Sequence, residues 1–342
     1  MKLLFINNSL IDFNNKNQNR NGGIEHCNIE LAKRLSLFGH DVSLVSKVKK
    51  KQKKFNIVNL PFDYLDRSDF NNAYDVIIGS NYSRAFKFKQ KTINVLWMHN
   101  ELQIEKSLRK KQFLPIILHR PHVVFVSKYL RQLTSSFYPF ESKTIIPNGC
   151  SELFINNKRN KDIKPIFIWT IKRDKGLSEI IDIWCRIIFK KLPHAELHVH
   201  GLNVPKEKNI IIDYDKFNIK FFGVVDRDFL ASKYKYSTAM LHPGYDETFC
   251  ISALEALASG LPVITFNRSA LSERVINNVN GYIVDTFESM AEKAINLAMN
   301  KSLLSNLSNN AMKISKKFCW NNIALMWNKY LNTLKQKKIQ YL

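Results

Sequence analysis

The hydrophobic positions in the first part of the chain form short runs that do not alternate with polar residues. Branched aliphatic side chains dominate these runs, which is typical of strands buried on both faces of a parallel sheet. Between the first two runs, apolar residues recur at helical spacing from Ile24 to Phe38, and Gly39 stands where such a helix would be capped. Strand, helix and strand in this order predict a doubly wound α/β fold. The predicted strands lie at residues 3–6, 42–45, 76–78, 95–98 and 123–126.

The same pattern begins again in the second part of the chain. After Pro147-Asn148-Gly149, an apolar run at 166–171 leads into a helical pattern from Leu177 to Ile188, and an amphipathic helix is predicted around 320–334. In such folds ligands bind outside the carboxyl ends of the strands, here in a cleft between two facing domains. Further strands are predicted at 197–199, 219–222, 239–241, 263–266 and 282–284.

These patterns predict the domain organisation. We expect a Rossmann-like domain at 1–150, a linker at 151–164, a second Rossmann-like domain at 165–318 and a C-terminal helix at 319–342 that packs back on the first domain. A chain of 342 residues is long enough for two hydrophobic cores.

The net charge indicates the kind of partner, and the cysteine content indicates the redox environment. The chain carries 52 Lys and Arg against 29 Asp and Glu, a formal net charge of +23, which favours phosphates, acidic glycans or an anionic membrane surface. The five cysteines form neither a Cys-x-x-Cys pair nor a Cys/His cluster, so a reducing, cytoplasmic environment is expected. The sequence shows no signal-peptide pattern and no apolar stretch of membrane-spanning length, so any membrane contact is expected to be peripheral.

The segment at 244–260 contains two glutamates in an otherwise apolar setting. Glu255 lies in a helix that is apolar nearly all round, where a carboxylate needs strong hydrogen bonds, such as those of a ribose diol. Glu247 stands eight residues earlier, before or at the helix start, about 12 Å away along a helix axis at the standard rise. The backbone N–H groups of Phe249, Cys250 and Ile251 at the helix start would bind a diphosphate. Alternatively, Glu247 caps the helix and Glu255 is the buried partner of an Arg or Lys.

These motifs resemble retaining glycosyltransferases of the group 1 family, family 4 in the usual classification. The resemblance implies the two-domain GT-B fold, an N-terminal acceptor-binding domain, a C-terminal nucleotide-sugar-binding domain and transfer of a hexose from a nucleoside diphosphate. It covers nearly the whole chain, and the order of its motifs is specific. They are Gly22-Gly23-Ile24-Glu25, Leu31 to Leu35, Gly39 to Val42, Pro147-Asn148-Gly149, Lys175-Gly176-Leu177, Phe222-Gly223, the segment at 244–260, Gly260 to Ile264, Glu273 and Asn280-Gly281.

The resemblance also implies residue roles. Gly22 and Gly23 would let the backbone approach the donor diphosphate, although a plain turn before a helix would use the same residues. Lys175 would neutralise phosphate charge, unless it is an ordinary solvated lysine. His99, at the end of a predicted strand, would touch the sugar or its phosphate, or else cap a helix or lie between the domains.

One position departs from the family pattern. The Arg that usually stands five residues before the motif lysine is replaced by Thr170, and Lys172 or Arg173 would supply that charge. Donor choice would depend on loop contacts around Val224.

The sequence contains no nucleophile with an adjacent base and no Asp-x-Asp placed to hold a cation. We therefore expect front-side departure of the diphosphate, no metal and no resident cofactor. The donor would be a nucleotide sugar, and the acceptor a glycan or a lipid-linked molecule. The basic, apolar segment Ser107 to Arg120 would lie on an anionic membrane or form an ordinary surface helix.

Three rival functions stay open at this stage. A sugar-nucleotide epimerase or a phosphorylase would share the fold, and a catalytically idle member would only bind partners. Nucleic-acid binding would fit the pI near 9.7, but no zinc-finger spacing, RNP-like motif or recognition helix supports specific binding.

Overall fold

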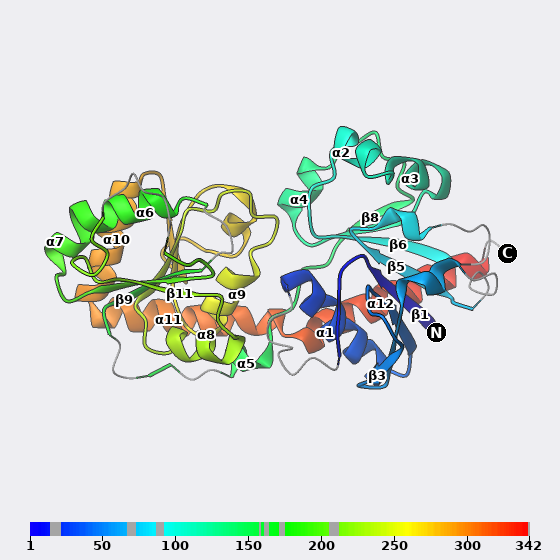
Figure 1. Cartoon of the computed structure of the whole chain (residues 1–342), viewed down its shortest axis with the longest axis horizontal. Coiled ribbons are helices and arrows are strands. Elements are labelled where there is room, and N and C mark those ends of the chain that lie inside the picture. Colours follow the sequence, from blue (N-terminus) through cyan, green and yellow to red (C-terminus); the bar gives the residue numbers. More distant parts are fainter. Residues whose placement is uncertain are drawn as a thin grey trace. The chain divides into compact units, whose positions relative to one another are not determined.

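The computed structural model describes residues 1–13, 22–66, 73–86, 92–156, 159–160, 164–170, 175–204 and 212–340. By their contacts, Met1–Gly149 and Trp320–Leu342 form one compact unit, and Cys150–Cys319 forms a second (Figure 1). All five cysteines are free. Within the described residues, no helix combines the length and apolar character needed to cross a membrane.

The first unit is built on a sheet with strand order β3-β4-β2-β1-β5-β6-β7-β8. All neighbours pair in parallel except β3 and β4. The five predicted strands are confirmed, with bounds that differ by one or two residues. The strands are β1 (Lys2–Asn7), β2 (Asp41–Val45), β3 (Gln52–Lys54), β4 (Ile57–Leu60), β5 (Val76–Ser80), β6 (Ile93–Met98), β7 (His122–Phe125) and β8 (Ser142–Ile145).

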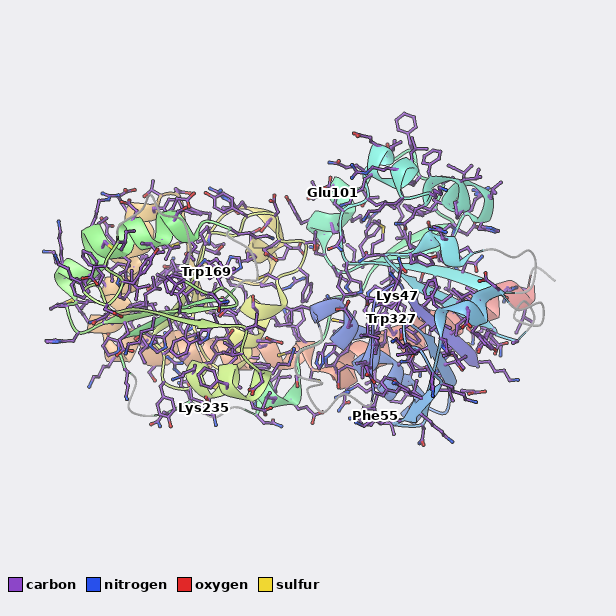
Figure 2. All side chains as sticks on the ribbon, viewed as in Figure 1. Lys47, Phe55, Glu101, Trp169, Lys235 and Trp327 are labelled. Atoms are coloured by element: carbon purple, nitrogen blue, oxygen red, sulfur yellow. The ribbon has the colours of Figure 1, made fainter. Side chains whose placement is uncertain are left out.

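The helices of the first unit include the C-terminal one. Helix α1 ends as predicted, because Gly39 adopts φ +83 just beyond it. Helix α12 packs on α1: Arg34 Nε donates to Asn321 Oδ1 at 3.0 Å, and Trp327, labelled in Figure 2, is fully buried. The helices are α1 (Gly23–Leu37), α2 (Ile104–Arg109), α3 (Phe113–His119), α4 (Lys128–Leu133) and α12 (Trp320–Gln340), with short 3-10 turns at Phe62–Asp66 and Ser83–Ala85.

The second unit contains an all-parallel sheet with strand order β11-β10-β9-β12-β13-β14. This is the doubly wound order that the sequence pattern predicts. Trp169, labelled in Figure 2, is fully buried in its core, which the strands share with α6, α10 and α11. The strands are β9 (Ile166–Thr170), β10 (Glu196–His200), β11 (Ile219–Gly223), β12 (Ala239–His242), β13 (Val263–Phe266) and β14 (Gly281–Val284).

The helices of the second unit cover both faces of its sheet (Figure 1): α10 packs on α6, and α11 packs on α9. The predicted helix from Leu177 continues through a π turn (Trp184–Ile188) into α7. The elements are α5 (Glu152–Ile155), α6 (Leu177–Ile183), α7 (Phe189–Lys191), α8 (Arg227–Tyr234), α9 (Ile251–Ala258), α10 (Phe287–Met299) and α11 (Lys301–Ser315), with 3-10 turns at Ser269–Glu273 and Lys316–Phe318.

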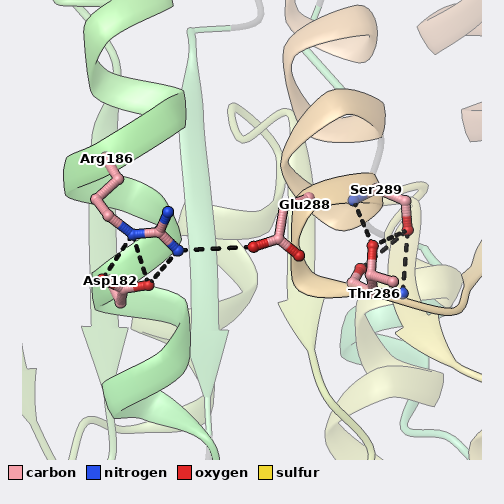
Figure 3. Close-up of polar contacts among 5 residues, drawn as sticks. All are labelled: Asp182, Arg186, Thr286, Glu288 and Ser289. Atoms are coloured by element: carbon pink, nitrogen blue, oxygen red, sulfur yellow. Dashed lines mark hydrogen bonds and ion pairs between the residues drawn. The ribbon is translucent and has the colours of Figure 1, made fainter.

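Local polar contacts fix α10 beside α6 (Figure 3). Thr286 and Ser289 form a capping box at the start of α10. Arg186 bridges Asp182, at 2.6 Å, and Glu288, at 3.6 Å. The Arg186 bridge is solvent-exposed, so it orients the helix more than it stabilises the unit.

The predicted linker at 151–164 includes ordered structure. Residues Glu152–Ile155 form α5, with Ser151 as the cap, and α5 packs on α8 and α9 of the second unit. Phe154 is completely buried, and its ring centroid lies 5.9 Å from that of Tyr234. An apolar side chain at that position anchors this part of the predicted linker on the second unit.

Candidate active site

The strand orders locate the positions where ligands bind in doubly wound sheets. The order reverses between β9 and β12 in the second unit and between β1 and β5 in the first. Loops leave the carboxyl ends of these neighbours in opposite directions, so a crevice forms at each point. In the second unit, Lys175 follows β9, and the segment Pro243 to Cys250 follows β12.

Lys175 and Glu247 form an ion pair at this point of the second sheet. Lys175 Nζ lies 2.9 Å from Glu247 Oε1 and donates to the carbonyl oxygen of Asp246 at 3.3 Å. Their side chains are 22% and 17% exposed, so both can reach a ligand. Burial raises the pKa of Glu247, and Lys175 opposes this rise. The structure therefore brings together two of the predicted catalytic residues.

Gly176 allows the loop that carries Lys175 to approach the loop after β12. Its φ is +87, and a Cβ there would lie 2.7 Å from the Tyr245 ring and 2.8 Å from Pro243. Only glycine combines this backbone conformation with so close an approach. The Lys175-Gly176 sequence thus specifies where the ammonium group stands.

His242 holds the loop between β12 and α9. Its Nδ1 accepts the N–H of Gly244 at 3.0 Å, so the proton of the neutral ring is on Nε2, which lies 3.3 Å from Cys250 Sγ. Burial lowers the pKa of His242 to about 3, so the ring is neutral. Cys250 itself is in the left-handed region, with φ +61, immediately before α9.

His242, Glu247 and Cys250 place three possible metal-ligand atoms within 4.8 Å of one another. A metal-bound imidazole ordinarily donates its second N–H to a neighbour. Here the second nitrogen of His242 already accepts a backbone N–H, and Nε2 carries the proton. The arrangement therefore suits a neutral His–Cys hydrogen bond better than a cation.

The start of α9 presents unoccupied backbone donors. Within the described residues, the N–H groups of Phe249, Cys250 and Ile251 make no hydrogen bond, and the first turn of α9 carries neither a side-chain cap nor an acid. Helix starts of this kind attract anions. Because α9 begins at Ile251, Glu247 lies in the loop before the start of this helix.

Glu255 is buried in α9 and paired. It is 4% exposed, and its Oε1 lies 2.5 Å from Arg227 Nη2 at the start of α8. Burial raises the pKa of Glu255, and Arg227 opposes this rise. The pairing matches the alternative that the sequence left open, a buried partner for an arginine, while contact with a ribose stays a prediction. Val224, in the loop before α8, is 60% exposed.

His99 lies at the carboxyl end of β6 in the first unit. Its backbone N–H donates to Asn81 Oδ1 at 2.8 Å, its ring centroid lies 4.4 Å from that of Trp97, and Asn148 Nδ2 is 3.5 Å from its Nδ1. Burial lowers the pKa of His99 to about 3. The imidazole is therefore neutral, and its role with a sugar or phosphate stays a prediction.

Gly22 and Gly23 begin α1, as the N-cap and the first helical residue. Gly22 has φ −63, which any residue adopts, but a Cβ there would overlap the Glu25 carboxylate. Its missing side chain thus makes room for Glu25 in this structure. Diphosphate binding by these glycines stays a prediction.

The comparison with known families concerns the second unit. Residues 151–314 match the model of the family described as glycosyl transferases group 1. These residues form a group 1 glycosyltransferase domain. The domain contains both glutamates, Lys175 and Arg227.

Relatives and solved structures extend this likeness. An uncharacterized glycosyltransferase of Methanocaldococcus jannaschii is 25% identical over 66% of this chain, which spans 64% of that relative. The alpha-monoglucosyldiacylglycerol synthase of Acholeplasma laidlawii is 21% identical, over 84% of this chain and 88% of that protein. Anabaena HepE, solved with UDP and glucose, superposes with a TM-score of 0.70 at 16% identity, covering 97% and 99% of the two chains. The chain has the GT-B fold.

Lys172 and Arg173 lie outside the described residues, so neither can be assigned to the charge missing at Thr170. Sequence reasoning missed Arg227 as the partner of Glu255. The only local signal is Asp226, which caps α8 through its side chain and so predicts that the next residue opens a helix.

Proposed function

We propose that the chain transfers a hexose from a nucleoside-diphosphate sugar to a glycan or lipid-linked acceptor, with retention of anomeric configuration. The observation that carries this proposal is the 2.9 Å Lys175–Glu247 pair beside the free N–H groups that open α9. A nucleotide sugar offers a complementary ligand, with two phosphate charges next to a ring of hydroxyls. The HepE structure, solved with UDP and glucose, supports a UDP-sugar as the first donor to test.

The group 1 domain has a partner for each part of such a donor. The diphosphate would accept hydrogen bonds from the N–H groups of Phe249, Cys250 and Ile251 and from Lys175. Lys175 would then share its charge with phosphate, and Glu247 would accept hydrogen bonds from hexose hydroxyls. Glu255 would accept the two ribose hydroxyls, with Arg227 keeping it ionised.

The proposed reaction needs no covalent enzyme intermediate. The bond between the anomeric carbon and the phosphate oxygen breaks, the acceptor oxygen bonds to the same face of that carbon, and the acceptor proton moves to the leaving phosphate. Lys175 and the α9 donors stabilise the charge that develops on the diphosphate, so we propose that neither a metal nor a resident cofactor takes part. His99, neutral near pH 7, would act as a hydrogen-bond partner rather than as an acid.

A nucleotide-sugar panel tests this proposal. Thermal unfolding of the full chain is measured with UDP-, GDP- and ADP-sugars, and NMR identifies the anomer formed on transfer. We expect Glu247→Gln to lower kcat about 100-fold while nucleotide binding persists, and Glu292→Gln, an exposed change in α10, to have no effect. Failure of every nucleotide to stabilise the chain contradicts donor binding, and an inverted product contradicts retention.

The lipid-linked acceptor has its own support in the first unit. Leu108, Leu114 and Leu118 on α2 and α3 are 56%, 63% and 66% exposed. The segment Ser107 to Arg120 also contains four cations, Arg109, Lys110, Lys111 and Arg120, and the A. laidlawii relative is named for a diacylglycerol product. Apolar residues among cations suit the surface of an anionic bilayer, so we propose peripheral contact from the cytoplasmic side.

Vesicle flotation tests the membrane contact. We expect binding to phosphatidylglycerol vesicles but not to phosphatidylcholine vesicles, with loss in Leu114→Ser/Leu118→Ser. Leu37→Ser, which changes a 70% exposed leucine of α1, is the control. Equal flotation of all three proteins would remove α3 from the proposed contact.

A further inference from the structure

A cavity of about 1020 Å³ opens at the amino edge of the second sheet, opposite the edge that carries Lys175 and Glu247. Its floor includes Pro165, Ala195 and Thr238, which stand immediately before β9, β10 and β12. These strands rise about 3.3 Å per residue, and β9 has five residues, which places the cavity about 15 Å from the donor-side loops. It is thus a separate site of the same domain.

One stripe of α11 forms a wall of this cavity. The lining residues of this helix recur at spacings of three and four, so they share one helical face. That face mixes hydroxyl, amide and apolar groups. Its members are Lys301, Leu304, Ser305, Ser308, Asn309 and Met312.

The lining is cationic and contains no carboxylate. Arg159, Lys191 and Lys301 line the cavity, and none of the other described lining residues is acidic. Arg159 donates to the carbonyl oxygens of Tyr234, at 3.1 Å, and of Ser237. Among the described residues, no carboxylate forms an ion pair with Arg159. A concave surface of one charge sign concentrates counter-ions, so the cavity favours an anion.

Ser308 supplies an independent sign of a ligand. Its side chain is 3% exposed, and within the described chain its Oγ has no hydrogen-bond partner. Buried hydroxyls are normally paired, because an unpaired one costs about 1–3 kcal/mol. A donor or acceptor from a bound molecule would satisfy it.

We propose that this cavity binds an anionic sugar chain. Carboxylate or phosphate groups would meet Lys191 and Lys301, sugar hydroxyls would bond to Ser308 and Asn309, and the apolar faces of the rings would pack on Met312. The volume lies at the upper end of the usual range for ligand pockets, about 300–1,000 Å³, which suits several sugar rings. Binding at this site would hold a long acidic glycan on the enzyme while another part of it reacts.

Calorimetric titration of the full chain tests the proposal without any transfer step, so its outcome is separate from that of the proposed function. The probes are trigalacturonic acid, glucose 6-phosphate, maltotriose and inorganic phosphate. Lys191→Glu/Lys301→Glu reverses the charges at the cavity. Lys190→Glu/Lys313→Glu makes the same change on the same two helices outside the lining.

We expect trigalacturonate, glucose 6-phosphate or both to bind more tightly than maltotriose and inorganic phosphate. Which of the two sugar anions has the higher affinity distinguishes carboxylate from phosphate recognition. Affinity should fall more than 10-fold in Lys191→Glu/Lys301→Glu and stay unchanged in the control pair. Ser308→Ala should weaken binding about 5-fold without lowering the melting temperature, because its hydroxyl has no partner in the chain. Equal binding by both charge-reversal pairs, equal binding of inorganic phosphate, or no binding of either sugar anion would overturn the proposal.

Discussion

The carboxyl edges of the two sheets differ in charge. At the first sheet, the polar partners of His99 are neutral: the Asn81 and Asn148 amides lie beside it, and burial lowers the pKa of His99 to about 3. At the second sheet, two ion pairs stand near the β9–β12 reversal, at 2.9 Å for Lys175–Glu247 and 2.5 Å for Arg227–Glu255. The same topology thus places neutral hydrogen-bonding groups around His99 in one unit and ion pairs in the other.

The largest expected effect comes from breaking the buried pair of the charged edge. Glu255→Ala leaves Arg227 without its carboxylate, so the free energy of unfolding should fall by about 3–5 kcal/mol, measured by urea denaturation. Removing both charges, in Glu255→Met/Arg227→Met, should restore most of the stability but not nucleotide binding. A loss under 1 kcal/mol in the single variant would show that the pair is not a structural element of this edge.

Removing the lysine charge from the partly exposed Lys175–Glu247 pair should lower kcat. Lys175→Met is expected to lower kcat with the preferred nucleotide sugar by about 10²–10³-fold, because a preorganised charge on the leaving group is lost. Lys190→Met on α7 is the matched control. If His99→Gln at the neutral edge lowered kcat more than Lys175→Met, the division of roles between the two edges would be wrong.

Acid should lower the free energy of unfolding, because the carboxyl edge of each sheet holds a neutral buried histidine, His99 or His200. Burial lowers the pKa of His200, at the end of β10, to about 3. Below about pH 6.5, His200 therefore binds a proton in the unfolded state but not in the folded state, so the free energy of unfolding falls as the pH falls. Between pH 7 and pH 5 the loss should be about 2 kcal/mol for this residue.

His200→Phe isolates that contribution. The new ring would stack on Phe222, whose centroid lies 4.8 Å from that of His200. We expect the variant to lose less unfolding free energy than the wild type between pH 7 and pH 5, measured by urea titration at both pH values. Identical pH dependence in the two proteins would assign the acid sensitivity to other groups.

The smallest expected effect on stability comes from replacing one glycine in each unit by alanine. Gly39 and Gly176 have φ +83 and +87, but a Cβ on Gly39 meets nothing within 4 Å, whereas one on Gly176 would meet Tyr245. Gly39→Ala should cost about 1 kcal/mol from backbone strain alone. Gly176→Ala should cost about 1 kcal/mol more and also lower kcat by displacing Lys175. Equal melting temperatures and normal kcat in both variants would contradict the close approach at Gly176.

The sequence predicted the parts of the fold that local pattern determines. Continuous apolar runs identified the central strands of both sheets, and Gly39 identified the end of α1. Strands β3 and β8 were missed because they are short and mostly polar, and β4 was missed although three of its four residues are apolar. Helix α5 was missed because a single buried residue, Phe154, anchors it.

The candidate site likewise has features that local sequence pattern predicts and features that only tertiary packing determines. Motif spacing selected Lys175, Glu247 and Glu255, but no local pattern predicts that Lys175 pairs with a residue 72 positions away. That contact exists because β9 and β12 are neighbours in the sheet. The Arg227–Glu255 pair likewise depends on how α8 and α9 lie against each other, which is a property of tertiary packing.

The Lys175–Glu247 contact also has a consequence for the first step of binding. Each side chain already has an opposite charge beside it, so neither waits as an isolated ion in a half-buried loop. In the proposed function, an arriving phosphate would replace the carboxylate as the partner of the ammonium group, and Glu247 would become available to the hexose. The pair would therefore hold the two loops in the arrangement that the proposed donor needs before that donor binds.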